Sequence, residues 1–428
     1  MLAFFPPELI TLIIKEVRPS RDSLKACALV CRSWCYPSQL FLFSRIVLSS
    51  DPDCKRWRSN IRESPHIASL VSELCISSSI NINARDVQNM VPEFSNVQCL
   101  EIDRFSEDWG DDEVEFVRRF RDVRRLRLNK TVWTARDRML EIFQAMPAIM
   151  SLMLGGSLAS TATQGSGLEG YGTVMNMSTG SVVLQNLAEL VLTSIERDDT
   201  ILEFLTSPAL DLSGLRSLEL QLGHVPDRQL SGHIMSQLFD AFLERVLSLP
   251  KCLVLSLPSI FSTGPFLGQV WRTCLPHLIS QRSLSSLSSV QTLVIRLPRL
   301  GHFHILLAHA WELVKTVSAP HLQQFRLEIC FTVESEPWKG GFNFVRELLE
   351  WKFLDEWFSD RERFPDIQRF EIGVDFVSLI HTEFEHSTIY KTVFNDVTRW
   401  MQERMPALSR KGILHFDMVN SNACSYLH

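Results

Sequence analysis

The sequence lacks the short motifs that mark the common catalytic and metal-binding sites. It contains no Walker A motif, no G-x-S-x-G, no H-E-x-x-H and no EF-hand loop. Its ten cysteines include no C-x-x-C pair, and Cys27, Cys31 and Cys35, spaced four apart, predict one helical face of buried free thiols and no zinc site. We therefore predict no catalytic residue, no metal and no cofactor, and an enzyme ranks third behind two kinds of binding protein.

Long runs of one kind of residue are also missing. No five consecutive residues carry like charge and the net charge is only -6, which predicts neither nucleic-acid binding nor a polyacidic tail. No uninterrupted apolar stretch reaches the roughly 18 residues of a membrane span, and the first residues do not form a signal peptide, so a cytoplasmic or nuclear location is expected. A chain of 428 residues that is 45% hydrophobic and 21% charged predicts a folded protein with two cores or a repeat array.

The first 48 residues predict three short helices with more apolar surface than so small a unit can bury alone. Pro6 and Pro7 favour a helix start, and an apolar stripe follows at Leu9, Ile10, Ile13, Ile14 and Val17. A second helix, capped by Ser20 or Asp22, has two apolar faces: Leu24, Cys27, Ala28, Cys31 and Cys35 form one, and Leu29, Val30 and Trp34 begin the other. We expect one face to pack on the rest of the chain and the other to bind a partner.

This segment resembles an F-box. The resemblance rests on Pro6-Pro7-Glu8-Leu9, on the run from Ala28 to Trp34 and on Leu42-Phe43 before Ile46 and Leu48, although Phe5 stands where the family usually has leucine. F-boxes bind the Skp1 adaptor of cullin-based ubiquitin ligases. The resemblance implies adaptor contacts through Pro6, Pro7, Leu9, Ile10, Ile13, Leu24, Leu29, Val30 and Trp34. An ordinary helical cap on a repeat domain is the alternative.

A repeat follows the helical segment. Its pattern is apolar, two variable, apolar, variable, apolar, and its central leucines at 74, 100, 126 and 152 are always 26 residues apart, which indicates a repeat architecture. The pattern continues less regularly and predicts eleven strands, centred on Leu74, Leu100, Leu126, Leu152, Leu190, Leu218, Leu253, Leu293, Phe325, Phe370 and Phe416, of which the copy at Leu253 and Leu255 is the weaker one. Amphipathic stretches between them predict helices over residues 113–120, 136–146, 229–249, 303–317, 344–358 and 390–405.

Strand, turn, helix and turn at this period resemble a leucine-rich repeat. The fold class implied is α/β, a three-helix F-box followed by a leucine-rich-repeat-like β/α solenoid with a parallel strand array. The asparagine or cysteine expected after each strand is mostly absent and only Cys330 conforms, so the repeats are degenerate, and a compact α/β domain is the alternative. The expected boundaries are an F-box-like domain over 1–48, a connector over 49–65, the repeat domain over 66–420 and a tail over 421–428.

Residues 155–181 interrupt the repeats with a stretch rich in glycine, serine and threonine, which predicts a flexible surface insertion. It includes G-x-G-x-x-G at Gly165, Gly167 and Gly170. The dinucleotide fingerprint needs a strand before it and a helix opening within it, and neither pattern is present, so no dinucleotide site is predicted.

The variable position between the last two apolar residues of each strand points away from the core, because strand side chains alternate. These positions are the candidate substrate-binding residues: Glu101, Arg127, Met153, Val191, Glu219, Val254, Val294, Arg326 and Glu371, with Cys75 and Asp417 at the ends of the row. The four apolar members predict an exposed binding stripe, rimmed by Asp103, Arg125, Arg296, Glu328 and Arg369. Alternatively, the C-terminal segment or the insertion covers the stripe.

Together these patterns favour a non-enzymatic substrate receptor of a ubiquitin ligase. The helical segment would bind a Skp1-like adaptor and through it a cullin, and the repeats would hold a protein substrate whose identity the sequence does not indicate. The alternative is an interaction scaffold with an F-box-like N-terminus and no ligase role. Neither hypothesis includes nucleic acid or a membrane as a partner.

Overall fold

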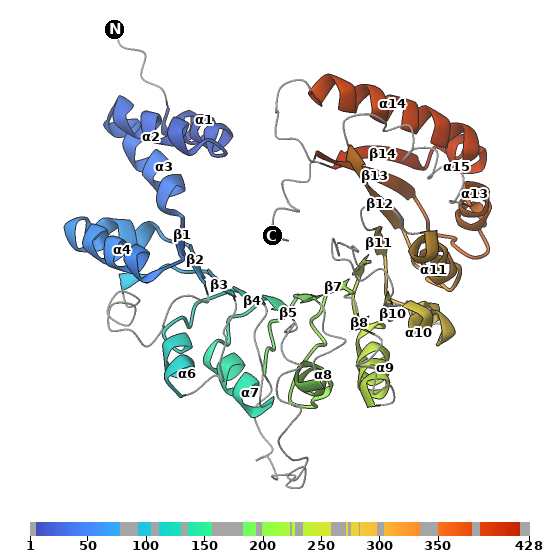
Figure 1. Cartoon of the computed structure of the whole chain (residues 1–428), viewed down its shortest axis with the longest axis horizontal. Helices are drawn as coiled ribbons and strands as arrows, with labels where there is room; N and C mark the ends of the chain where they lie inside the picture. The colour runs from blue at the N-terminus through green and yellow to red at the C-terminus, as the bar shows by residue number, and fades with distance from the viewer. Residues whose placement is uncertain are drawn as a thin grey trace. The chain divides into compact units, whose positions relative to one another are not determined.

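Figure 1 shows the computed structural model of the chain, which describes residues 6–77, 93–103, 111–129, 136–155, 183–193, 199–222, 225–226, 234–257, 271–272, 275–281, 283–297, 304–333, 350–378 and 386–419. The chain divides into two compact units. Unit 1 comprises Met1–Leu187 with Ser207–Gly214, and unit 2 comprises Ala188–Thr206 with Leu215–His428.

Unit 1 begins with three helices, α1 (Pro7–Val17), α2 (Arg21–Val30) and α3 (Arg32–Phe43), so the predicted helices are present. Pro7 stands in the first turn of α1, where its missing N–H costs nothing, and Ser20 Oγ accepts a hydrogen bond from the Ser23 N–H at the start of α2 (3.2 Å). The three helices enclose a small buried core, consisting of Ile10, Ile14 and Leu24, with Val17, Trp34, Phe41 and Leu42 packed against it.

Cys31 separates α2 from α3. Its backbone is extended (φ -165°, ψ 172°), so the helix does not continue through it, and Cys27 and Cys35 lie on different helices. Cys31 is exposed, while Cys27 and Cys35 are half-buried. The prediction of one helical face of buried thiols is therefore wrong.

The predicted connector, residues 49–65, is largely a packed helix. Helix α4 (Asp51–Glu63) begins after Ser50, whose Oγ accepts a hydrogen bond from the Asp53 N–H, and it buries Cys54, Trp57 and Ile61. The rings of Trp57 and Phe43 of α3 are nearly perpendicular, with centroids 6.3 Å apart. A 3-10 helix, η1 (Pro65–Leu70), leads from α4 into the next strand. The charged residues suggested a linker, but apolar residues at helical spacing fold this segment into a helix that packs against the rest of the unit.

The strands of unit 1 are parallel and follow chain order: β1 (Arg45–Leu48), β2 (Glu73–Ile76), β3 (Cys99–Asp103), β4 (Arg125–Asn129) and β5 (Ser151–Gly155). The central leucines of the repeat lie in register, and Ile46 of β1 pairs with Leu74. Strand β1 was not among the predicted strands, so the sheet begins inside the segment that resembles an F-box. Helices α6 (Asp111–Val117) and α7 (Arg136–Ala145) lie on one side of these strands (Figure 1).

Unit 2 continues the same construction with seven parallel strands in chain order: β6 (Glu189–Thr193), β7 (Ser217–Gln221), β9 (Cys252–Ser256), β11 (Thr292–Arg296), β12 (Gln324–Val333), β13 (Arg369–Ser378) and β14 (Leu414–Val419). Its helices are α8 (Asp199–Thr206), α9 (Ile234–Val246), α10 (Leu275–Ser280), η6 (Ser283–Ser286), α11 (His304–Lys315), α13 (Trp351–Ser359), α14 (His386–Arg404) and α15 (Pro406–Arg410). Short strands β8 (Val225–Pro226) and β10 (Trp271–Arg272) pair antiparallel with each other.

All eleven predicted strands are present, and the α/β class with parallel strands is confirmed. Helices α6, α7, α9, α11, α13 and α14 fall at the six helices predicted between the strands, whereas α4, α8, α10 and α15 were not predicted. The insertion lies almost wholly outside the described residues, as does the predicted tail. No described helix combines the length and apolar character needed to cross a membrane.

The core lies beneath one face of the strands. The central leucines of the repeat are buried, and their neighbours on each strand point to the opposite face. In unit 2 the Phe325 ring packs against Phe358 of α13 and Phe370 of β13, with centroids 4.2 and 5.2 Å apart. The helices thus cover one face, and the other face is lined by the variable residues.

Candidate interaction surfaces

The helices α1 to α3 carry a concentrated apolar surface. The described residues include nine large apolar side chains that are strongly exposed, and seven of them belong to these helices: Leu9, Leu12, Ile13, Leu29, Val30, Tyr36 and Leu40. We call this set the N-terminal apolar surface. Leu29 is its most prominent member, with 87% of its surface exposed. Large exposed apolar side chains gathered in one small helical unit are typical of interaction sites.

Four of the nine residues predicted to contact an adaptor belong to this surface: Leu9, Ile13, Leu29 and Val30. Pro6, Pro7, Leu9, Ile13, Leu29 and Val30 are exposed and Trp34 is half-buried. Ile10 and Leu24, in contrast, are buried in the small core, because α1 and α2 need one apolar face to pack against α3. These two residues support the surface from below and are not available for contact.

The helix break at Cys31 determines where the most exposed residues of the N-terminal apolar surface lie. Because α2 ends at Val30 and the backbone then extends, Leu29 and Val30 project from a helix end where no following turn covers them. The Cys31 Sγ lies 3.0 Å from the Ser33 Oγ. This hydrogen bond, together with one from the Trp34 backbone N–H, lowers the pKa of the Cys31 thiol.

The strand face of unit 1 carries an ion-pair network, which we call the arginine face: Arg45, Arg125 and Arg127 with Glu73 and Glu101. Arg45 Nη2 lies 3.4 Å from Glu101 Oε2, and Arg125 Nη2 donates to Glu73 Oε1 at 3.2 Å. Arg127 Nη1 lies 3.8 Å from Glu101 Oε2. The network crosses β1 to β4, so it joins the strand that follows α3 to the repeats.

Two cysteines lie among these charges. Burial raises the pKa of the Cys75 thiol to about 11, with the nearby Glu101 carboxylate acting in the same direction. Burial also raises the pKa of Cys99. Both thiols are therefore protonated at neutral pH and are poor nucleophiles.

The strand face of unit 2 carries a tighter network around Arg326. This guanidinium contacts Glu328 at 2.8 Å, Glu371 at 2.5 Å and Asp417 at 3.2 Å, and thereby connects β12, β13 and β14. Gly373 makes the last contact possible, because a Cβ there would lie 3.1 Å from Arg326 Nη2. Arg369 Nε also lies 3.0 Å from Glu371 Oε2. The Glu371 carboxylate is almost fully buried, and these two guanidinium groups compensate its charge.

The apolar stripe predicted on the strand face is not exposed. Val254 and Val294 are only 7% and 8% exposed, and Met153 and Val191 are half-buried. A physical reason is visible at Val254, where Arg296 reaches from β11 across β9 to Glu219 on β7. The members of the predicted row that take part in ion pairs are Glu101, Arg127, Glu219, Arg326, Glu371 and Asp417.

Sequence reasoning missed Arg45 because it did not identify β1, and it missed Glu73 although the strand that contains it, β2, was predicted. The signal was present: Phe43, Ile46 and Leu48 repeat the apolar pattern of the later strands.

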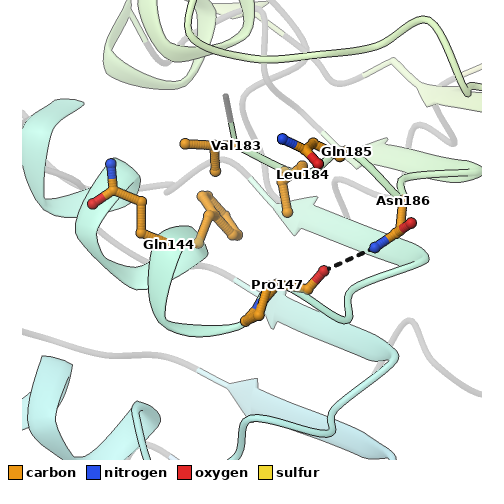
Figure 2. Close-up of a pocket in the computed structure, with 7 residues that line it drawn as sticks. Gln144, Pro147, Val183, Leu184, Gln185 and Asn186 are labelled. Atoms are coloured by element: carbon orange, nitrogen blue, oxygen red, sulfur yellow. Dashed lines mark hydrogen bonds between the residues drawn. The ribbon is translucent and has the colours of Figure 1, made fainter. Parts of the chain in front are cut away.

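One small pocket of about 360 Å³ lies in unit 1, between the end of α7 and the segment Val183–Asn186 (Figure 2). Asn186 Nδ2 donates to the Pro147 carbonyl at its rim (3.2 Å), and Leu184 has a left-handed backbone (φ 61°). The described residues that line it include no titratable side chain. The described part of the chain also contains no cluster of three or more His, Cys, Asp or Glu residues with metal-binding geometry.

No protein-family model matches the chain, and no curated protein matches it.

Proposed function

We propose that the chain is a non-enzymatic substrate receptor. In this proposal α1 to α3 act as an F-box and bind a Skp1-like adaptor, which links the chain to a cullin, and the strand face holds a protein substrate for ubiquitin transfer by other subunits. The receptor contributes by positioning its substrate.

The N-terminal apolar surface is the observation that carries the proposal. Exposing Leu29 and Val30 to water is unfavourable, and fully burying such a side chain is worth about 1.5 to 3 kcal/mol. Ile10, Ile14 and Leu24 form the core of the three helices, so the exposed apolar residues do not contribute to that core. A partner with an apolar groove would account for them.

The continuity between α3 and β1 supports the receptor role. Only Ser44 separates the two elements, and its carbonyl accepts hydrogen bonds from the Ser72 and Glu73 N–H groups at 2.9 and 2.8 Å. The N-terminal helices are thus anchored directly to the first strands of unit 1. Such an anchor would hold a substrate bound on these strands at a fixed distance from the adaptor.

Co-expression with a Skp1 adaptor, followed by co-purification, tests the proposal. We expect a stoichiometric complex with the natural chain and its loss with Leu9→Asp combined with Leu29→Asp. Met150→Asp is the matched control, since Met150 is 47% exposed and lies outside the N-terminal apolar surface. Circular dichroism establishes that each variant is folded.

Failure of the folded natural chain to bind the adaptor would overturn the ligase role and favour the interaction scaffold. Equal loss of binding in the Met150→Asp control would show that the effect is not specific to the N-terminal helices.

A further inference from the structure

Strand β14 is the last strand of the described sheet, and β13 is its only partner among the described residues (Figure 1). The Ile413 carbonyl accepts a hydrogen bond from the Phe370 N–H of β13 (2.8 Å). Because successive backbone groups of a strand point to alternate sides, the N–H and C=O groups of Leu414, Phe416 and Met418 face away from β13. We call this side of β14 the free edge, since these groups have no backbone partner within the described residues.

The apolar positions of β14 are also less covered than those of its neighbour. Phe370, Ile372 and Val374 of β13 are fully buried, whereas the residues of β14 that pair with them are half-buried. At the first strand, β1, helices α3 and α4 are in contact with the strand, and Ile46 and Leu48 are fully buried. Within the described residues, the first strand therefore has its apolar positions covered, and the last strand has them partly open to water.

A free edge of this kind is a template for a further strand. Many proteins protect an edge strand with lysine, proline or a bulge. Strand β14, with the sequence LHFDMV, contains neither lysine nor proline and pairs with β13 without a bulge. A further strand at this edge would supply partners for the backbone groups and would cover the half-buried apolar side chains.

The sequence of β14 is complementary to itself in one antiparallel arrangement. A two-fold axis through Phe416 places Leu414 opposite Met418 of a second copy, and His415 opposite Asp417 of that copy. Each residue whose backbone groups face the free edge then meets another such residue, so the hydrogen bonds can form. The apolar side chains meet on the helix side of the sheet, and on the strand face each imidazole meets a carboxylate.

The neighbouring arrangements are less favourable. An axis through Asp417 brings the two Asp417 carboxylates opposite each other, and like charges in that position are destabilising. An axis through His415 places Asp417 opposite the apolar Ile413. An axis between two residues pairs an edge-facing residue with one whose groups face β13, so the ladder cannot form. The axis through Phe416 therefore satisfies the backbone and the side chains together.

We propose that the chain forms a two-fold dimer in which the free edge of β14 pairs antiparallel with the free edge of β14 of a second copy. Each copy supplies the strand that the other lacks. The inference is independent of the proposed adaptor binding, because it uses no residue of the N-terminal helices.

Sedimentation velocity of the full chain across the micromolar range tests the proposal, and we expect a dimer. Met418→Pro should be monomeric, because proline removes an N–H that faces the free edge and leaves the ladder to β13 intact. His415→Asp should weaken the dimer about tenfold, because each Asp417 would then face a second carboxylate. His415→Arg should keep the dimer, because a guanidinium group also pairs with Asp417.

Lys352→Gln is the matched control for His415→Asp, because it changes the net charge by the same amount with a neutral histidine. Lys352 is 89% exposed on α13, and the variant should sediment as the natural chain does. Since His415 pairs in register with Glu371, His415→Asp also places a carboxylate beside β13. Circular dichroism establishes that each variant is folded, and Met418→Pro tests the edge without adding a charge.

Phe416→Cys tests the position of the two-fold axis. The Cα atoms of a hydrogen-bonded antiparallel pair lie about 5.5 Å apart, which is within the range of a disulfide. Under mild oxidation we expect a disulfide that joins position 416 of two copies, identified by mass spectrometry. A dimer of the folded variant without this disulfide would overturn the proposed pairing.

Two other origins of a dimer, or of a protected edge, can be distinguished. Leu9→Asp with Leu29→Asp removes association through the N-terminal apolar surface, and a dimer lost in this folded variant would overturn the proposal. So would a dimer that persists in both Met418→Pro and His415→Asp. A natural chain that stays monomeric would also overturn it, and slow hydrogen exchange at Leu414, Phe416 and Met418 would then show that another segment of the same chain covers the edge.

Discussion

Arg296 on β11 donates from Nη1 to Glu219 Oε1 on β7 at 2.6 Å, across the intervening strand β9. Neighbouring strands lie about 4.8 Å apart, so the arginine side chain spans two strand spacings. The contact links residues 77 positions apart in the sequence. The contact joins Glu219 to the ion-pair network on the strand face of unit 2. The Arg296 side chain crosses β9, the strand that carries the buried Val254.

A double-mutant cycle with Arg296→Met and Glu219→Gln should reveal this contact as a coupling of about 1 kcal/mol in the free energy of unfolding, because both side chains keep some solvent exposure. Denaturant unfolding provides the measurement. The cycle for the exposed pair Lys315 and Glu312 is the comparison and should give about 0.3 kcal/mol. Equal couplings in the two cycles would argue against a special role for the contact across β9.

Gly373→Ala should destabilise unit 2 by about 1 to 3 kcal/mol, the usual cost of overpacking. The added Cβ would lie 2.9 Å from Val419 Cγ2 and 3.1 Å from Arg326 Nη2, so β14 or the guanidinium must move. Denaturant unfolding measures the loss. Full stability in the alanine variant would mean that the contact between Arg326 and Asp417 is not held as closely as described.

Asp355→Ala should cost about 1 to 3 kcal/mol of stability, because it leaves two backbone donors without their acceptor. The buried carboxylate of Asp355 accepts from the Ala407 and Leu408 N–H groups at 2.9 and 2.8 Å, which fixes the start of α15. Asp355→Asn should recover part of the loss, since it keeps one acceptor oxygen.

Asp360 offers a control for Asp355. Its carboxylate also accepts a backbone N–H, from Glu362 at 2.9 Å, but it is exposed, so water replaces it in Asp360→Ala. We expect a loss within about 0.5 kcal/mol, as for most surface positions. If the two alanine variants were equally stable, burial would not be the factor that gives Asp355 its importance.

Thiol alkylation should distinguish Cys31 from Cys75. Hydrogen bonds lower the pKa of Cys31, which is exposed, while burial and Glu101 raise that of Cys75 to about 11. A raised pKa keeps the thiol protonated, so at pH 8 the thiolate fraction of Cys75 should be at least about a hundredfold below that of Cys31.

Mass spectrometry after brief treatment with iodoacetamide should therefore find Cys31 modified long before Cys75. Both rates should rise with pH, and that of Cys75 should continue to rise beyond pH 10. Comparable rates at pH 8 would show that Cys75 is more accessible, or its thiolate more stable, than the structure indicates.

The strands could be predicted from the sequence because their apolar positions must repeat at the spacing that buries them. Leu74, Leu100, Leu126 and Leu152 face one core and therefore keep one register. Helix α4 was not predicted, although Ser50 and Pro52 are typical of a helix start. The charged residues around Trp57 were interpreted as a solvent-exposed connector, and the helical spacing of the apolar residues was overlooked.

The ion pairs of the strand face could not be predicted in the same way. Alternation indicates that Arg296 points to this face, but not whether it turns toward Glu219, Glu328 or solvent. That choice depends on rotamers and on the strand order across two or more repeats. Whether Val254 is exposed depends on the direction that the Arg296 side chain takes. The prediction of an exposed apolar stripe was therefore wrong.

The parallel ladder has an evolutionary consequence. Leu74 and Leu100, which pair on β2 and β3, are 26 residues apart, whereas Phe370 of β13 and its neighbour on β14, Leu414, are separated by α14 and α15. Parallel pairing is kept in both cases, because additional residues leave the sheet at a strand end and return at the start of the next strand. The repeat pattern is shifted by two residues at β14, where Phe416, the predicted centre, pairs with Ile372 and not with Phe370. Connections of this kind can acquire whole helices without disturbing a single paired strand. A lineage built this way can diverge widely in length and sequence while the strands keep their order.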